Sequence, residues 1–236
     1  METFPQIIRV ANQEKGLVAA KKILYERVND KTLLFLSGGK TPKDLYTSLA
    51  KEKKLIVKAV GMVDERADSS NYKMIKLTGL LDYLENLKIK FFPILRTHLK
   101  GVKLNPESVA GVYNETVLKL VEKFKNKIAI VGIGEDGHTA GIPARIPHFA
   151  KASRGKQNSD YAIRIDDFPG EFKERITLTF KTLAEMDLLI ILAFGFVKQN
   201  ALKEMFSNGP IEEIPARFYA KPEIAKKTIL ITDQKI

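Results

Sequence analysis

Short apolar runs recur along the chain and alternate with stretches of helical periodicity. The runs are typical of buried strands and cover Thr32–Leu36, Ile56–Val63, Lys127–Gly132, Tyr161–Ile165, Arg175–Phe180, Leu188–Ala193 and Thr228–Ile231. The predicted helices are Glu14–Val28, Pro42–Lys51, Ser108–Phe124 and Val197–Phe206. This alternation predicts an α/β fold with a mainly parallel sheet flanked by helices.

The length of the chain, 236 residues, allows one large domain or two small ones. No internal repeat and no linker rich in Gly, Ser or Pro divides it, so we predict a single domain over residues 1–236. The segment Gly141–Gln157 is irregular and partly basic, and we interpret it as a loop or flap. In open α/β sheets ligands bind at the carboxyl ends of the strands, so the residues after each apolar run are the first functional candidates.

Composition narrows the class of protein. Apolar residues make up 44% of the chain and charged residues 28%, as in a packed globular protein. The chain has no cysteine, which excludes disulfides, thiolate zinc sites and thiol nucleophiles and favours a reducing compartment. The N-terminus lacks a signal-peptide pattern, and the longest apolar stretch, Leu188–Val197, is about half of the ~20 residues that a membrane span needs. We therefore expect a cytoplasmic protein without membrane contact.

The net charge of +11 favours an anionic partner, either a nucleic acid or a phosphorylated metabolite. The 28 acidic residues are interspersed among the 39 basic ones, and no long basic tract stands out. Charge alone does not choose between these partners.

The first candidate motif follows the strand Thr32–Leu36 and leads into a helix. It consists of Ser37, Gly38, Gly39, Lys40 and Thr41, followed by Pro42. Two glycines allow a tight turn, Thr41 can cap the helix, and Pro42 suits its first position, so free backbone N–H groups would favour a phosphate. The alternative is an ordinary strand-to-helix turn. A P-loop is excluded, because Leu34 stands where that motif requires glycine.

The second motif is Asp64-Glu65-Arg66, again at the end of an apolar run. Its two carboxylates could hold sugar hydroxyls, and the guanidinium of Arg66 could bind a phosphate through paired hydrogen bonds. Taken alone, a solvated charged turn is the more common interpretation of such a cluster.

The third motif is the glycine-rich segment Val131–Ala140, which contains Gly-x-Gly-x-x-Gly after a strand. Glu135 and Asp136 would meet the pyrophosphate of a dinucleotide, so we discount NAD binding. The segment presents Asp136 close to His138, and a histidine beside a carboxylate is a plausible general base. The other histidines, His98 and His148, have no such setting.

Two further cations stand at element boundaries. Arg175 opens the segment Arg-Ile-Thr-Leu-Thr, and Lys198 follows the apolar stretch Leu188–Val197. Either is an ordinary surface residue when taken alone, but beside the glycine-rich segment both offer contacts to a phosphate. No metal site is expected, because three scattered histidines and no cysteine give no ligand pair at a suitable spacing.

Together these motifs, in this order and over most of the chain, resemble the 6-phosphogluconolactonase family, and Asp136-Gly-His-Thr-Ala140 is the most characteristic piece. The resemblance implies a modified Rossmann-like fold of the sugar-phosphate isomerase/lactonase type. It implies hydrolysis of 6-phospho-D-glucono-1,5-lactone, with His138 as the general base that activates water and Asp136 as its polar neighbour. The Ser37–Thr41 loop, Arg66, Arg175 and Lys198 would hold the phosphate. No metal, cofactor or covalent intermediate is implied.

The resemblance leaves alternatives open. The related glucosamine-6-phosphate deaminases usually have a tyrosine after Asp-Glu and a glutamate five residues after the histidine, where this chain has Arg66 and Pro143. Both differences favour the lactonase. The segment Gly141–Arg145 departs from the usual lactonase continuation, and the familiar proline-rich run is missing. A non-catalytic sugar-phosphate sensor and a nucleic-acid binder rank lower, and either a monomer or a small homo-oligomer is compatible with the sequence.

Overall fold

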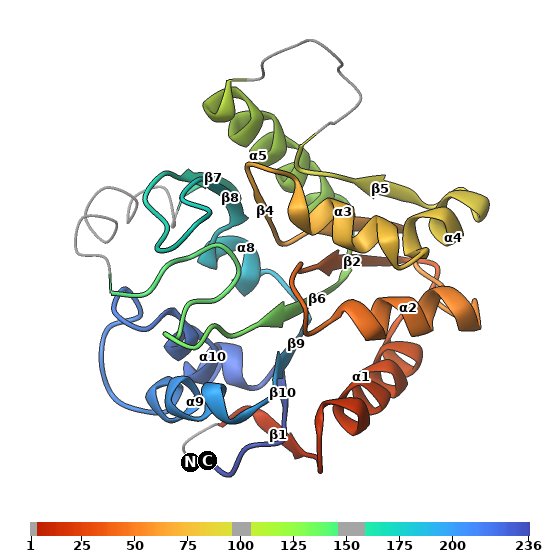
Figure 1. The fold of residues 1–236 in the computed structure, drawn as a ribbon. Helices are drawn as coiled ribbons and strands as arrows, with labels where there is room; N and C mark the ends of the chain where they lie inside the picture. Colours follow the sequence, from red (N-terminus) through yellow and green to blue (C-terminus); the bar gives the residue numbers. More distant parts are fainter. Residues whose placement is uncertain (1–3, 96–104, 146–158) are drawn as a thin grey trace.

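A seven-stranded parallel sheet forms the centre of the protein (Figure 1). The computed structural model describes residues 4–95, 105–145 and 159–236. In spatial order the strands are β1 (Gln6–Arg9), β10 (Thr228–Thr232), β9 (Leu188–Ala193), β6 (Asn126–Gly132), β2 (Thr32–Leu36), β3 (Ala59–Met62) and β5 (Lys90–Phe92). All residues of β2, β3 and β10 are buried, as expected for apolar strands that are covered on both faces.

Helices cover this sheet on both sides, with α1 and α2 on one side in Figure 1 and α9 and α10 on the other. The α-helices are α1 (Gln13–Arg27), α2 (Lys43–Glu52), α3 (Ser70–Leu77), α4 (Leu80–Asn86), α5 (Pro106–Lys123), α8 (Phe180–Ala184), α9 (Gln199–Met205) and α10 (Pro222–Ala225). Two 3-10 helices of the described residues, η1 (Phe196–Lys198) and η2 (Pro215–Ala220), lie in the C-terminal third. The predicted α/β class is confirmed.

A second sheet stands beside the first and has three antiparallel strands in the order β4 (Asp64–Arg66), β8 (Arg175–Leu178) and β7 (Ala162–Ile165). Val63 joins the two sheets: its N–H donates to Leu36 O at 2.9 Å, and its carbonyl accepts from Leu178 N at 2.8 Å. Two of the predicted strands therefore belong to this antiparallel sheet and not to the parallel one.

Several element boundaries differ from the prediction. Thr41 does not cap α2, which begins at Lys43 after Pro42 and has no side-chain cap. The predicted strand Ile56–Val63 shortens at both ends to β3, and Ile56 is exposed. The predicted helix Val197–Phe206 divides into η1 and α9. The prediction of one domain over residues 1–236 stays a prediction.

The predicted flap Gly141–Gln157 is described only as far as Arg145. Its remainder, with His148, and the loop that contains His98 lie outside the described residues.

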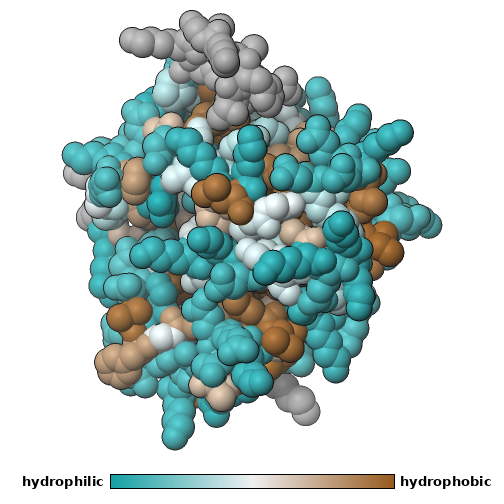
Figure 2. Space-filling model, turned by 45° about the vertical axis from the view of Figure 1, so that its right-hand side comes forward, coloured by the Kyte–Doolittle hydropathy of each residue, from teal (hydrophilic) through white to brown (hydrophobic). Residues whose placement is uncertain are grey.

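Hydrophilic residues predominate on the face of the molecule shown in Figure 2, and hydrophobic residues gather there in small groups. Within the described part of the chain, no helix is long and apolar enough to cross a membrane.

Candidate active site

The glycine-rich segment forms a closed turn after β6. Gly134 N donates to His138 O at 2.8 Å, and Gly137 N donates to Gly134 O at 3.2 Å. Within the turn, Asp136 Oδ1 accepts from His138 N at 3.0 Å and lies 2.6 Å from His138 Nδ1. Burial raises the pKa of Asp136, but the bonds and charge of His138 outweigh this and lower it to about 2. Asp136 is therefore a carboxylate that orients the imidazole.

This contact assigns the ring nitrogens of His138. Because Nδ1 faces a carboxylate, we place the proton of the neutral ring on Nδ1, which leaves Nε2 as the basic nitrogen. Gly134 makes the arrangement possible, since a Cβ at this position would lie 2.0 Å from Nδ1 and 2.7 Å from Asp136 Oδ1. The His138 side chain keeps 28% exposure, so a water molecule can reach it.

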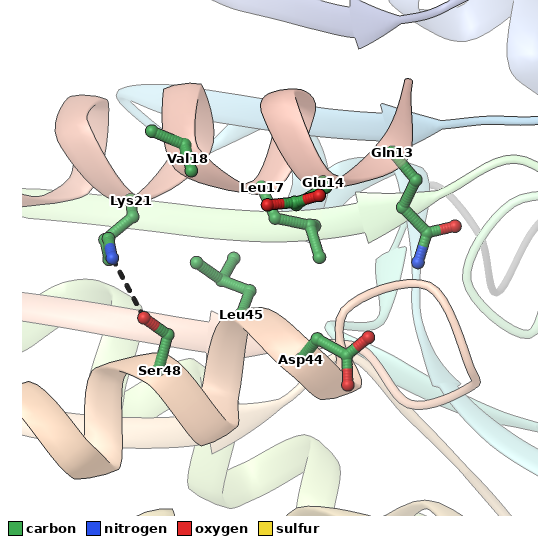
Figure 3. A pocket seen from close by; sticks show the side chains of 8 residues that line it. All are labelled: Gln13, Glu14, Leu17, Val18, Lys21, Asp44, Leu45 and Ser48. Atoms are coloured by element: carbon green, nitrogen blue, oxygen red, sulfur yellow. Dashed lines mark hydrogen bonds between the residues drawn. The ribbon is translucent and has the colours of Figure 1, made fainter.

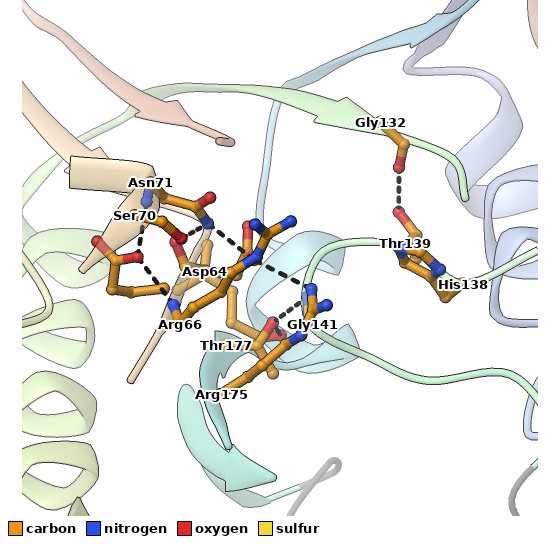
Figure 4. A network of polar contacts seen from close by, with 12 residues as sticks. Asp64, Arg66, Ser70, Asn71, Gly132, His138, Thr139, Gly141, Arg175 and Thr177 are labelled. Atoms are coloured by element: carbon orange, nitrogen blue, oxygen red, sulfur yellow. Dashed lines mark hydrogen bonds and ion pairs between the residues drawn. The ribbon is translucent and has the colours of Figure 1, made fainter. Parts of the chain in front are cut away.

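Three contacts fix the turn, and Figure 4 shows those from Thr139 to Gly132 and from Gly141 to Thr177. Thr139 Oγ1 donates to Gly132 O at 3.0 Å and lies 2.7 Å from the hydroxyl of the buried Tyr219 in η2. Gly141 N donates to Thr177 Oγ1 on β8 at 2.9 Å. The histidine therefore lies between the parallel sheet, which carries the turn, and the antiparallel sheet.

The antiparallel sheet places two arginines side by side. Arg66 on β4 pairs directly with Arg175 on β8, and Asp64 pairs with Thr177. Like charges at directly opposed positions repel each other. Both Nε atoms are buried and have no hydrogen-bond partner among the residues that the structure describes. Such a pair is suited to an anion that bridges the two guanidinium groups.

Asp64 provides part of the compensating charge. Its Oδ2 lies 3.9 Å from Arg175 Nη1 and accepts from Asn71 Nδ2 at 3.1 Å. Burial raises the pKa of Asp64, although Arg175, Arg66 and His138 act in the opposite direction. Burial likewise lowers the pKa of Arg175. One carboxylate between two guanidinium groups leaves an excess of positive charge.

Glu65 points away from this cluster, because successive side chains of a strand alternate between its faces. Glu65 is 1% exposed, and its carboxylate accepts hydrogen bonds from the backbone N–H groups of Arg66, Asn71 and Tyr72 at 2.8 to 3.0 Å. Burial raises the pKa of Glu65 to about 7. Sequence adjacency grouped Glu65 with Asp64, whereas the structure uses Glu65 to anchor the start of α3. The predicted ligand contact of Glu65 stays a prediction, and its carboxylate already accepts three backbone hydrogen bonds.

The predicted phosphate loop lies next to the Asp64 cluster. A Cβ on Gly38 would be 2.0 Å from Asn71 Cγ, so this glycine lets the loop pack directly on the side chain that binds Asp64. Ser37 is buried, with its N–H donating to Ile130 O at 3.1 Å, and Lys40 is exposed. Gly39 and Thr41, which flank Lys40, are half-buried.

Lys198 is the last residue of η1 and lies near the glycine-rich turn. Burial lowers its pKa, and the charges of Glu135 and Asp136 on the turn act against this shift. Lys198 is therefore close to the carboxylates beside His138. The structure thus gathers Asp136, His138 and Lys198 at the turn, and Asp64, Arg66 and Arg175 on the antiparallel sheet.

Two phenylalanines between β7 and β8 complete the cluster and were missed by the sequence analysis. The Phe168 ring lies 3.4 Å from Arg175 Cζ and meets the His138 ring edge to face at 5.1 Å. The Phe172 ring lies 4.7 Å from Arg66 Cζ. No local pattern marks these rings as part of a site, because only the fold brings them to the arginines.

A separate pocket of about 300 Å³ lies between α1 and α2 (Figure 3). Leu17 and Leu45 line it, and Lys21 there already binds Ser48 and Glu52. Its lining contains none of the predicted site residues. Among the described residues, no group of three or more His, Asp or Glu side chains could hold a metal ion.

Comparison with known proteins places the chain in a family. The family model for glucosamine-6-phosphate isomerases/6-phosphogluconolactonase matches residues 11–229. The chain belongs to this family. A 6-phosphogluconolactonase from Thermotoga maritima is 28% identical over 212 residues, which cover 87% of this chain and 86% of that protein. A glucosamine-6-phosphate deaminase from Enterococcus faecalis is 25% identical over 227 residues, with coverage of 89% and 91%.

The fold agrees with this assignment. The structure of a 6-phosphogluconolactonase from Trypanosoma cruzi superposes with a TM-score of 0.77 at 25% identity, covering 98% of this chain and 95% of that chain. The predicted family resemblance is confirmed. The family comprises enzymes that act on sugar phosphates, and it contains both lactonases and deaminases. The choice between the two activities rests on the residues of the site.

Proposed function

We propose that the protein hydrolyses 6-phospho-D-glucono-1,5-lactone to 6-phosphogluconate. The observation that carries this proposal is the 2.6 Å contact between Asp136 Oδ1 and His138 Nδ1, close to the guanidinium of Arg175. It supplies a basic nitrogen and an anion-binding group in one place. Proton removal from water and binding of a phosphate are the two tasks that hydrolysis of a phosphorylated lactone requires.

In the proposed reaction, Nε2 of His138 takes a proton from water while the water oxygen attacks C1 of the lactone. Asp136 stabilises the imidazolium that forms. When the tetrahedral intermediate collapses, the bond between C1 and the ring oxygen breaks, and the ring oxygen receives the proton from Nε2. The product is a hydroxy acid that loses its carboxyl proton to solvent. A lactone is an activated ester, so no covalent enzyme intermediate is needed.

The phosphate would bind at the paired arginines. Arg66 and Arg175 lie on neighbouring strands, and their Nε atoms have no partner among the described residues. Lys198 adds a cation near Asp136, and the Ser37–Thr41 loop packs on Asn71 beside Asp64. Bidentate contacts to phosphate oxygens would relieve the repulsion between the two guanidinium groups. Asp64 would limit the excess charge and leave room for one anionic group.

Two residues favour the lactonase over the deaminase. Arg66 occupies the position that is usually tyrosine in deaminases, and Pro143 stands where they usually have a glutamate. Pro143 has no acid group, so a carboxylate partner for the histidine at this position is missing. Among the described residues, Asp136 is the carboxylate that contacts His138.

The test is lactone hydrolysis by the purified protein, with the substrate generated in situ and spontaneous hydrolysis subtracted, beside a glucosamine-6-phosphate deamination assay. We expect lactone turnover well above background and its loss in His138→Ala, with binding of 6-phosphogluconate retained. Lys22→Ala, an exposed cation on α1, is the control and should behave as wild type. Deamination alone would assign the protein to the other branch of the family. Binding without either activity would indicate a sensor.

A further inference from the structure

The connection between β7 and β8 brings one aromatic ring to each of the two arginines. Phe168 N donates to Lys173 O at 2.9 Å, which closes the connection. Phe168 is 3% exposed and its ring stacks on Arg175, whereas the half-buried Phe172 lies on Arg66. Each guanidinium therefore has an aromatic face as its neighbour.

An aromatic face supports a guanidinium differently from a carboxylate. The ring attracts the flat face of the cation and limits its movement, but it offers no acceptor to the N–H groups at the edge. In agreement with this, the Nε atoms of Arg66 and Arg175 have no hydrogen-bond partner among the described residues. The two rings thus hold the arginines for a ligand without occupying the atoms that would bind it.

Phe168 has a second contact that Phe172 lacks. Its ring meets the imidazole of His138 at a centroid distance of 5.1 Å and an interplanar angle of 87°. One side chain therefore touches the group that would take the proton and the group that would hold the anion. A shift of this ring would change the distance between them.

The packing around Phe168 supports a role beyond core filling. Phe168 belongs to a small cluster with Ile163 and Ile165, which is separate from the main hydrophobic core. Both isoleucines lie on β7, and Ile165 is directly opposite Arg175. The cluster thus packs the ring against β7, the strand that pairs with the arginine-bearing β8, outside the main core.

We propose that Phe168 is a positioning residue that sets His138 and Arg175 relative to each other, and that Phe172 positions Arg66 alone. This inference rests on the proposed function, because it assigns the two rings to the same reaction. It predicts different kinetic effects for two phenylalanines that lie four residues apart on one connection.

The experiment compares Phe168→Leu with Phe172→Leu, since leucine keeps much of the apolar volume and removes the ring. Loss of a stacked ring should raise KM about 5- to 30-fold in both variants. Phe168→Leu should also lower kcat about tenfold or more, because misplaced catalytic groups slow the chemical step. Phe172→Leu should keep kcat within about twofold. Phe168→Tyr, which retains the ring, should recover most of kcat.

Ile163→Val is the matched control, because it loosens the same small cluster without removing a ring. It should keep both kinetic constants close to wild type. If it lowers kcat as much as Phe168→Leu does, general loosening of the β7–β8 connection explains the effect and the proposal is overturned. Wild-type kcat in Phe168→Leu would also overturn it.

A readout independent of turnover separates this inference from the proposed function. The ring resonances of His138, assigned by their loss in His138→Gln, should shift in Phe168→Leu and stay in place in Phe172→Leu, because only Phe168 lies against the imidazole. Binding of inorganic phosphate, measured by calorimetry, should weaken in both leucine variants. If the wild type fails to hydrolyse the lactone, the proposed function is wrong. Unchanged His138 resonances and unchanged phosphate binding would refute the positioning role itself.

Discussion

Substitution of Gly134 by alanine tests the geometry of the proposed general base. An added Cβ would lie 2.0 Å from His138 Nδ1, and ordinary contact begins at 3.4 Å, so the ring has to withdraw by about 1.4 Å. The same Cβ would lie 2.7 Å from Asp136 Oδ1, so the carboxylate cannot follow freely. A displacement of about 1 Å can cost on the order of 100-fold in rate. We therefore expect Gly134→Ala to lower kcat for lactone hydrolysis about 100-fold.

The matched control lies two residues away in the same segment. A Cβ on Gly132 would meet only Leu192 O, at 3.9 Å, so Gly132→Ala adds the same methyl group without a clash. KM should change little in either variant, because the two arginines belong to another sheet. Both variants are assayed for lactone hydrolysis and for unfolding by urea. If Gly134→Ala turns over the lactone as fast as Gly132→Ala, the contact between Asp136 and His138 does not control the reaction.

Three further predictions concern the groups around this pair. The pKa of Asp136 is lowered to about 2 in the folded protein, so its contribution to stability is present above the ordinary carboxyl pKa and is lost as pH falls from about 4 to 2. In Asp136→Asn, the midpoint of urea unfolding should therefore change less with pH over this range. Arg66→Lys and Arg175→Lys should each raise KM about tenfold, because lysine cannot form paired bonds to phosphate, and unchanged KM would remove that residue from the phosphate site. Tyr219→Phe leaves the buried Thr139 hydroxyl one partner short and should lower the free energy of unfolding by about 1 kcal/mol, as urea titration would show.

The parallel sheet could be predicted from the sequence wherever a strand is buried on both faces. β2 and β9 agree with the predicted runs residue for residue, because side chains on both faces of these strands pack against apolar neighbours. β1 was missed: it is an edge strand whose exposed residues show no apolar run, and it pairs with β10 from the other end of the chain. β4 was missed because its three residues are polar and its partner strand is distant in sequence.

In the candidate site, too, residues close in sequence could be predicted together, whereas contacts between distant segments could not. Asp136 and His138 were predicted together because they lie two residues apart on one turn. The opposition of Arg66 and Arg175 depends on strand pairing across more than a hundred residues, which a motif does not reveal. The sequence places Glu65 next to Asp64, whereas the pleat turns neighbouring side chains to opposite faces of the strand.

The junction of the two sheets explains why the site lies where it does. A parallel sheet ends in turns that present backbone N–H groups and a short-range pair such as Asp136 and His138, but its buried strands cannot hold two cations side by side. The antiparallel sheet can hold two cations, because its strands have a face of their own outside the main core. Val63 and the bond from Gly141 to Thr177 connect this sheet to the parallel one. Unbalanced positive charge is thus kept out of the main core, next to His138, where a bound anion would neutralise it.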